Sequence, residues 1–208
     1  MHGVNSVLPA SLNTLTVLGT KMSHLVYKLQ PAEYSKYRKH LLALDEESRY
    51  TRFGFMIRDE TIEQLCDKFE ANTQDHKIFV IEDADLDVIA AGHISLEGGE
   101  TELAFSVLKE YRQQGMGSSL MSRTIEWCQN RNIRGGCMVC LSSNTAIKKL
   151  ASKHGLLIND GGETLANIVI PTATAASVIH EVVDSSMARA DHLGKLQRKF
   201  VRSLYNGS

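Results

Sequence analysis

The order of the segments between residues 77 and 141 constrains the fold of this chain more than any other feature of its sequence. Three β-rich runs, 77–82, 88–96 and 101–108, are joined by short turn-like segments, which predicts an antiparallel meander. The third run leads through a glycine-containing turn into a helical pattern, and the apolar run 137–141 that follows is typical of a buried strand. The chain is therefore expected to be an α/β (α+β) protein with helices packed on a sheet.

Further elements are predicted before this unit. Residues 24–29 alternate as in a strand, Pro31 opens a helical pattern, and Asp59 caps a second helix. Between the two helices we expect a loop that holds four large side chains, namely Arg49, Tyr50, Arg52 and Phe53.

After the apolar run, which Gly135-Gly136 separates from the helix before it, we expect a helix over about 144–154 with Gly155 as its left-handed stop. Paired strands at 156–159 and 163–170 follow. From Ala173 to Leu204 apolar residues recur at about 3.6-residue spacing, which predicts an amphipathic helix. We divide the chain into three parts: an N-terminal extension (1–22), an α/β domain (23–171) and a C-terminal helical extension (172–208).

Composition narrows the classes of function. Lys and Arg number 23 against 24 Asp and Glu, and the formal charge of -1 gives no overall field for nucleic acid or anionic membrane. Four cysteines are too few for a disulfide scaffold, and no apolar stretch reaches the roughly 20 residues that cross a bilayer. We expect a cytoplasmic protein with no nucleic-acid or membrane partner, although the basic end from Lys195 to Arg202 leaves local nucleic-acid binding as an alternative.

Two patterns that suggest metal sites are better explained otherwise. Cys137 and Cys140 would point to opposite faces of a strand, and no second ligand pair has the right spacing, so we expect core thiols. Asp83-x-Asp85-x-Asp87 begins like a calcium loop, but Val88 stands where that loop needs glycine, so we expect a hairpin turn. We therefore expect no metal.

The turn Arg112-Gln113-Gln114-Gly115-Met116-Gly117 suggests phosphate binding. The backbone N–H groups and positive dipole end of a helix N-terminus hold phosphate oxygens, and glycines allow the ligand to approach the main chain. The same glycines serve as well in a tight turn or in close packing, so the spacing alone leaves both interpretations open. A P-loop is excluded because no lysine precedes Ser118, and a dinucleotide fingerprint because Leu120 replaces its third glycine.

Taken together, the strand Glu102–Val107, the turn Arg112-x-x-Gly115-x-Gly117, and Asn144 with Leu150 and Gly155-Leu156 resemble the GNAT N-acetyltransferases. The resemblance covers about residues 24–170 in element order. It implies a mixed, mostly antiparallel sheet of six or seven strands, flanked by helices on both faces. It also implies that strand four splays from strand five and that the thioester of acetyl-CoA enters between them.

The resemblance also implies roles for particular residues. Glu102 is the expected catalytic base, although a strand-end glutamate is often only solvated or salt-bridged. Backbone N–H groups near Ser106 and Val107 would bind the thioester carbonyl. The tyrosine that often protonates the departing thiolate is replaced by Ala151, so the acid is unassigned. The cofactor-binding residues implied are Phe105, Ser106, Val107, Arg112, Gln113, Gln114, Gly115, Met116, Gly117, Ser118 and Asn144.

A second resemblance concerns the acceptor. Leu44-x-x-Glu47-Ser48-Arg49-Tyr50-x-Arg52-Phe53 is similar to a segment of GNAT domains related to bacterial protein-lysine acetyltransferases. Arg49 and Arg52 would then line the acceptor site, but loop arginines are more often solvated or paired. His93 is another candidate for the acceptor side, with a satisfied core histidine as the alternative.

The implied activity is transfer of an acetyl group from acetyl-CoA, a co-substrate, to a primary amine of a small molecule or a protein lysine. The amine would attack directly within a ternary complex. The alternative is a catalytically silent CoA-binding module that acts through protein interaction, which the missing tyrosine at Ala151 favours. The apolar stripe of the C-terminal helix predicts a docking face or a homodimer interface.

Overall fold

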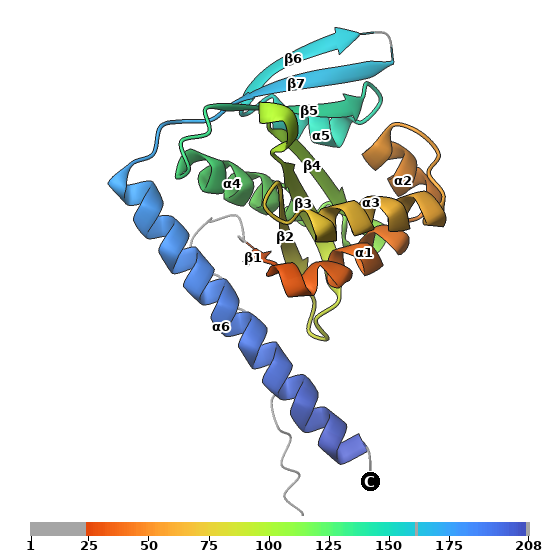
Figure 1. Cartoon of the computed structure of the whole chain (residues 1–208), viewed down its shortest axis with the longest axis vertical. Coiled ribbons are helices and arrows are strands. Elements are labelled where there is room, and N and C mark those ends of the chain that lie inside the picture. The colour runs from red at the N-terminus through yellow and green to blue at the C-terminus, as the bar shows by residue number, and fades with distance from the viewer. Residues whose placement is uncertain (1–23, 161, 207–208) are drawn as a thin grey trace, which may run out of the picture.

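A seven-stranded sheet forms the centre of the structure, a computed structural model that describes residues 24–160 and 162–206 (Figure 1). The predicted N-terminal extension, residues 1–22, lies outside the described residues. Of the neighbouring pairs only β4 and β5 are parallel, which confirms the predicted mixed, mostly antiparallel sheet. The strand order is β1 (Tyr27–Lys28), β2 (His76–Glu82), β3 (Val88–Ser95), β4 (Glu102–Val107), β5 (Gly135–Leu141), β7 (Glu163–Val169) and β6 (Gly155–Asp160).

Helices cover both faces of this sheet, as predicted. Side chains alternate along β2: Ile78 and Val80 belong to a core under α1 and α3, whereas Phe79 and Ile81 belong to a second core under α4. Burial on both faces explains why β2 and β3 are nearly continuous apolar runs. The described residues form α1 (Tyr34–Leu42), α2 (Glu46–Phe53), α3 (Asp59–Ala71), α4 (Met116–Gln129), α5 (Thr145–Ala151) and α6 (Ala175–Asn206).

The sheet opens between β4 and β5. Their parallel ladder consists of one pair, Glu102 with Cys137, joined by the Cys137 N–H donating to the Thr101 carbonyl at 2.8 Å. Beyond this pair β5 continues its pairing with β7 alone, and β4 continues its pairing with β3. Figure 1 shows β5, β6 and β7 turning away from β2, β3 and β4. We call the region between the diverging strands the β4–β5 opening, and it confirms the predicted splay.

The segment predicted as a loop with Arg49 and Arg52 is instead helix α2, and that prediction was wrong. Asp45 caps the helix by accepting from the Ser48 N–H at 2.8 Å, and Gly54 ends it at φ 80° with its N–H bonded to the Tyr50 carbonyl. Both caps are visible in the sequence. The segment lacks the apolar stripe of a longer helix, so periodicity alone does not reveal it.

Glycines near β5 and β6 also behave differently from the prediction. Gly155 is not a helix stop: it begins β6, where a Cβ would lie 1.8 Å from the Asn167 carbonyl oxygen of β7. Gly135 and Gly136 belong to β5 rather than separating it from the preceding helix. The strand predicted over 24–29 is shorter, because only the two residues of β1 pair with β2.

The remaining sequence expectations are confirmed in part. Asp59 is the first residue of α3 and not its cap, which is Arg58. All four cysteines are free. Cys140 is buried, as expected of a core thiol, whereas Cys137 is only partly buried. Asp83 forms the expected hairpin turn, since its carboxylate accepts from the Asp85 and Asp87 N–H groups at 2.9 Å. In the described part of the chain, the helices lack an apolar stretch that would let one span a bilayer.

Candidate active site

The backbone of β4 presents donors to the β4–β5 opening. In an antiparallel pair, alternate residues direct their N–H groups toward the partner strand. The Leu108 N–H donates to Ile89 on the β3 side at 3.0 Å, so the register turns the amides of Phe105 and Val107 the other way. These two N–H groups therefore face the opening, whereas the amide of Ser106 faces β3.

The turn before α4 has the backbone conformation that its glycine suggested. Gly115 caps the helix with φ 87°, a left-handed conformation that residues with a Cβ adopt only with strain, and Gln113 has φ 64°. The first amides of α4 have no carbonyl four residues earlier within the helix, and they share its positive dipole end. The turn thus points a set of donors out of the helix start.

Packing gives no reason for the second glycine of the turn. Among the residues that the structure describes, a Cβ built on Gly117 would meet only Leu150 Cδ2, at an ordinary 3.7 Å, and the residue is partly exposed. Gly155, in contrast, would clash with backbone. A glycine with room for a side chain is what a backbone needs where a ligand approaches closely.

Side chains connect this turn to α2. The Arg112 guanidinium donates to Ser48 Oγ at 2.6 Å, and Ser48 Oγ in turn donates to the Asp45 carboxylate that caps α2. Lys109 lies 3.5 Å from Asp45. Hydrogen bonds from Ser48 hold the pKa of Asp45 below its usual range. Helix α2 contacts both β4 and β5, so this link fixes the turn relative to the helix beside the opening.

Glu102 lies at the closed end of the opening, on the face covered by α1, α2 and α3. Its position in β4 pairs with Ser95 and places it on the same face as Ala104 and Ser106. The side chain is exposed. Burial is the main cause that raises the pKa of the Tyr37 phenol, and the charge of Glu102 is near enough to add to this shift. A carboxylate beside the site that is accessible to an incoming amine can remove a proton from it.

A buried polar cluster lies under α2 next to Glu102. We define it as Tyr37, His40, His93, Ser106 and Arg52. Arg52 reaches the Tyr37 hydroxyl at 3.5 Å, and among the described residues its Nε has no hydrogen-bond partner. Its charge, together with burial as the larger cause, lowers the pKa of both His40 and His93.

The hydrogen bonds of His40 determine its tautomer. Its Nδ1 lies 2.9 Å from the Val88 carbonyl, which only accepts, so Nδ1 carries the hydrogen. Its Nε2 then accepts from the Ser106 hydroxyl at 2.8 Å. Burial lowers the pKa of His40 to about 4, so the ring is neutral at pH 7 and the hydroxyl of Ser106 is fixed in one direction.

His93 is a buried histidine, as the alternative interpretation had it. Its Nε2 lies 3.1 Å from Nδ1 of His76, and His76 Nε2 lies 3.4 Å from the carboxylate of Glu97. Arg49 is paired, which was the alternative to a role in the acceptor site, because it donates to the Leu42 and Leu44 carbonyls. Arg52 is thus the arginine of α2 that belongs to the candidate site.

Two predicted positions lie near α5. Asn144 caps this helix by accepting from the Ile147 N–H at 3.2 Å. Ala151 is fully buried in the core under α4, so its side chain supplies no acid to the site.

The sequence did not predict Tyr37 and His40 as residues of the candidate site. The signal available was a histidine and two tyrosines on the buried side of one helix, at Tyr34, Tyr37 and His40.

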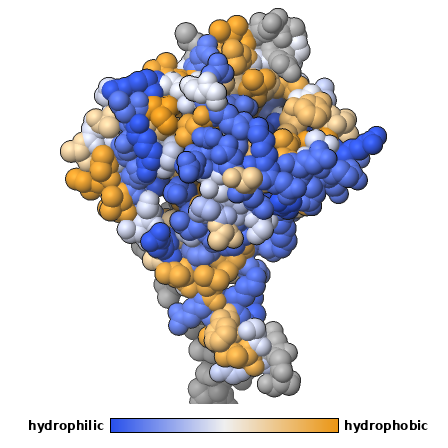
Figure 2. Space-filling model, in the orientation of Figure 1, coloured by the Kyte–Doolittle hydropathy of each residue, from blue (hydrophilic) through white to orange (hydrophobic). Residues whose placement is uncertain are grey.

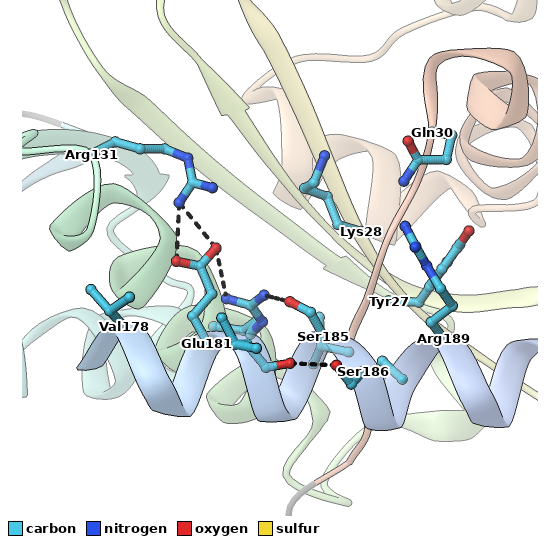
Figure 3. A pocket seen from close by; sticks show the side chains of 13 residues that line it. Tyr27, Lys28, Gln30, Arg131, Val178, Glu181, Ser185, Ser186 and Arg189 are labelled. Atoms are coloured by element: carbon cyan, nitrogen blue, oxygen red, sulfur yellow. Dashed lines mark hydrogen bonds and ion pairs between the residues drawn. The ribbon is translucent and has the colours of Figure 1, made fainter. Parts of the chain in front are cut away.

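A cavity of about 430 Å³ lies elsewhere, between α6, β1 and α4 (Figure 3). Lys28, Arg131 and Glu181 line it. Strands β2 and β3 separate β1 from the β4–β5 opening, so this cavity is distinct from the candidate active site.

Comparison with known proteins agrees with this geometry. Residues 74–155 match the model of the acetyltransferase (GNAT) domain. No curated protein matches the chain by sequence. Among solved structures, the GNAT domain of S. lividans PAT is similar with a TM-score of 0.56 and 17% identity, covering 69% of this chain and 89% of that one.

Two further structures have the same fold. The PaiA N-acetyltransferase from Thermoplasma acidophilum, in complex with coenzyme A, gives a TM-score of 0.52 at 15% identity and covers 71% of this chain and 99% of its own. A mutant of the spermidine N-acetyltransferase SpeG from Vibrio cholerae gives a TM-score of 0.52 at 13% identity and covers 71% of this chain and 94% of its own. The matched domain contains β4, the glycine turn and α4, on which the opening is built, so residues 74–155 match the GNAT acetyltransferase domain and the chain has the fold of the GNAT acetyltransferases.

Proposed function

We propose that this protein transfers the acetyl group of acetyl-CoA to a primary amine, of a small molecule or a protein lysine, by direct attack in a ternary complex. The observation that carries the proposal is the β4–β5 opening, with the amides of Phe105 and Val107, which face away from β3, on one side and the donor-rich turn at Gly115 and Gly117 near its end. This arrangement fits an extended ligand with a carbonyl at one end and a diphosphate at the other.

Each part of the ligand has a matching group. The diphosphate would bind the first-turn amides of α4, where Gly117 leaves room for close approach. The thioester carbonyl would accept from the Phe105 and Val107 N–H groups, which are fixed before the reaction and stabilise the oxyanion as it forms. Arg112 would act mainly by holding the turn against α2, since its guanidinium is bonded to Ser48.

The reaction needs one base. Glu102 would take a proton from the acceptor ammonium, directly or through water, and the free amine nitrogen would attack the thioester carbon. The tetrahedral intermediate then collapses, the C–S bond breaks, and the CoA thiolate takes up a proton from water. The proposal involves no metal.

Two substitutions test binding and chemistry separately. Gly117→Ala places a methyl group where the diphosphate would lie, and the space around Gly117 lets the protein fold normally. We expect its Kd for CoA, measured by calorimetry, to rise at least about tenfold with an unchanged thermal midpoint, because a methyl group keeps the phosphate from the backbone donors. Unchanged CoA affinity would remove the turn from the proposed site.

Glu102→Gln tests the base. We expect turnover with labelled acetyl-CoA and a panel of amines to fall by about 100-fold or more, while CoA affinity is retained. Glu100→Gln is the matched control, since Glu100 is an exposed carboxylate two residues earlier, outside the strand. Equal turnover in the two variants would contradict the role of Glu102. Binding of CoA without any acetyl transfer by the natural sequence would favour the catalytically silent alternative.

A further inference from the structure

Helix α6 contacts its own domain through polar groups. Glu181 accepts from Asn130 and Arg131 of the α4 region at 2.7 and 3.0 Å, and Ser185 accepts from Arg123 at 2.6 Å. Figure 3 shows Glu181 bonded to Arg131, with Ser185 on the same side of the helix.

The polar contacts continue along the helix. His192 lies 2.6 Å from the Glu82 carboxylate and stacks on the Tyr27 ring, and Arg202 pairs with Asp85 of the β2–β3 turn. Charged and hydrogen-bonding groups therefore set which side of α6 faces the domain.

The apolar side of α6 consequently faces outward. Within Ala175–Asn206 only Ala188 and His192 are buried, whereas Ile179, Leu193 and Phe200 are 64%, 57% and 64% exposed. A surface helix ordinarily turns its apolar stripe toward the core. Figure 2 shows apolar side chains on the part of α6 that extends beyond the domain. The helix has 32 residues and is therefore about 48 Å long at 1.5 Å per residue, and contiguous exposed apolar surface on a helix of this length is typical of an interaction site.

The exposed side has the spacing of a two-helix interface. Its positions alternate four and three residues apart, the repeat by which one helix keeps the same side toward another over several turns. We call these positions the α6 seam: Ile179, Val183, Ser186, Ala190, Leu193, Gln197, Phe200 and Leu204.

We propose that α6 pairs antiparallel, along this seam, with α6 of a second copy of the chain. The seam is complementary to itself when reversed about a point between Asp191 and His192. Apolar positions then meet apolar ones, the only two polar positions meet each other, and the small central alanine meets a leucine. The opposed positions are Ile179 with Leu204, Val183 with Phe200, Ser186 with Gln197, and Ala190 with Leu193.

The pairing leaves the candidate active site free. Each domain lies on the side of α6 away from the seam, and α6 packs against β1, at the edge of the sheet far from β5. The two sites would lie on the outer sides of the dimer. Dimerisation and acetyl transfer can therefore be tested independently.

Sedimentation equilibrium of the full chain tests the proposal. We expect twice the mass of one chain at micromolar concentration, and an increase of about 100-fold or more in the dimer Kd for Leu193→Asp, which would bury a carboxylate in the seam. Leu193 is exposed in the single chain, so the variant should keep its circular dichroism and thermal midpoint. Met56→Asp, at an equally exposed apolar residue outside α6, should leave the dimer intact.

Cross-linking tests the orientation. Val183→Cys and Phe200→Cys proteins, mixed and oxidised, should form a mixed disulfide dimer, because the two positions oppose each other only in the antiparallel pair. Within one helix they are about 25 Å apart, beyond the reach of a disulfide. Efficient cross-linking of Val183→Cys alone would indicate a parallel pair and overturn the proposal. A monomer that binds vesicles of anionic phospholipid through α6 would also overturn it, as would a dimer unaffected by Leu193→Asp.

Discussion

The buried histidine of α1 gives a prediction about acid stability. Burial lowers the pKa of His40 to about 4, and the nearby charge of Arg52 acts in the same direction. The unfolded chain has the ordinary value of 6.5. Between these two values the unfolded state binds a proton that the folded state does not, so the free energy of unfolding falls as the pH falls through that range.

The size of this effect follows from the two pKa values. At pH 5 the histidine is almost fully protonated in the unfolded chain and neutral in the folded one, which costs about 2 kcal/mol relative to pH 7. The full difference, reached below pH 4, is about 3.4 kcal/mol. Both figures are comparable with the total stability of a marginal domain, so the effect is measurable.

Urea unfolding of the natural sequence and of His40→Gln, each at pH 7 and pH 5, measures this contribution. We expect the variant to lose about 2 kcal/mol less between the two pH values, since glutamine does not titrate. The buried histidines His76 and His93 also have lowered pKa values, but they contribute equally to both proteins and cancel in the comparison. An equal loss in the two proteins would refute the assignment of His40 as a neutral ring that accepts from Ser106.

Three further predictions concern the framework. Gly115→Ala should lower the free energy of unfolding by about 1 kcal/mol, because alanine is strained at φ 87°; an unchanged urea midpoint would argue against the left-handed cap. Leu120→Ala, in the core under α4, should cost about 2–5 kcal/mol in the same assay, and a loss below 1 kcal/mol would show that this core is loosely packed. His180 has a raised pKa because of its hydrogen bond to Glu126, with Asp184 adding to the shift and Arg123 opposing it. Its stabilising effect is present below pH 6.5 and is lost as the pH rises through the raised pKa. Between pH 6 and 8 the natural sequence should therefore lose a small part of its free energy of unfolding, under about 1 kcal/mol for this exposed side chain, and His180→Gln should not show this loss.

The elements that sequence predicted well are those whose signal is local. The runs of β2, β3 and β4 combine β-branched residues with turn residues, and α4 follows a glycine at a position that requires a left-handed backbone. Helix α2 was missed because its stability comes from its two ends, Asp45 and Gly54, and from packing on β4 and β5, rather than from a stripe of apolar residues.

The part of the candidate site that sequence predicts best is one continuous segment, although Arg52 was also expected from a second resemblance. Glu102, Phe105, Val107 and the glycine turn follow one another along the chain, so a sequence pattern can carry them. The pair formed by His40 and Ser106 joins residues 66 positions apart, and nothing in either segment indicates the other. Such contacts depend on how α1 packs across β3 and β4, which is a property of the tertiary structure alone.

Helix α6 shows what the spacing of apolar residues does not predict. Apolar residues at 3.6-residue spacing predict that a helix has an apolar side, but not which surface that side meets. In this chain the carboxylates of Glu82 and Asp85, and Arg123 on α4, engage the polar side of α6, and these groups come from segments about 100 residues earlier or from α4. Had apolar residues occupied those positions, the same stripe would have packed against the domain. The outward direction of the α6 seam thus depends on both partners, because Glu181 and His192 of the helix bond to groups of the domain. Replacing Glu82 and Asp85 with apolar residues should therefore weaken the proposed dimer, measured by sedimentation equilibrium, without any change in the sequence of α6.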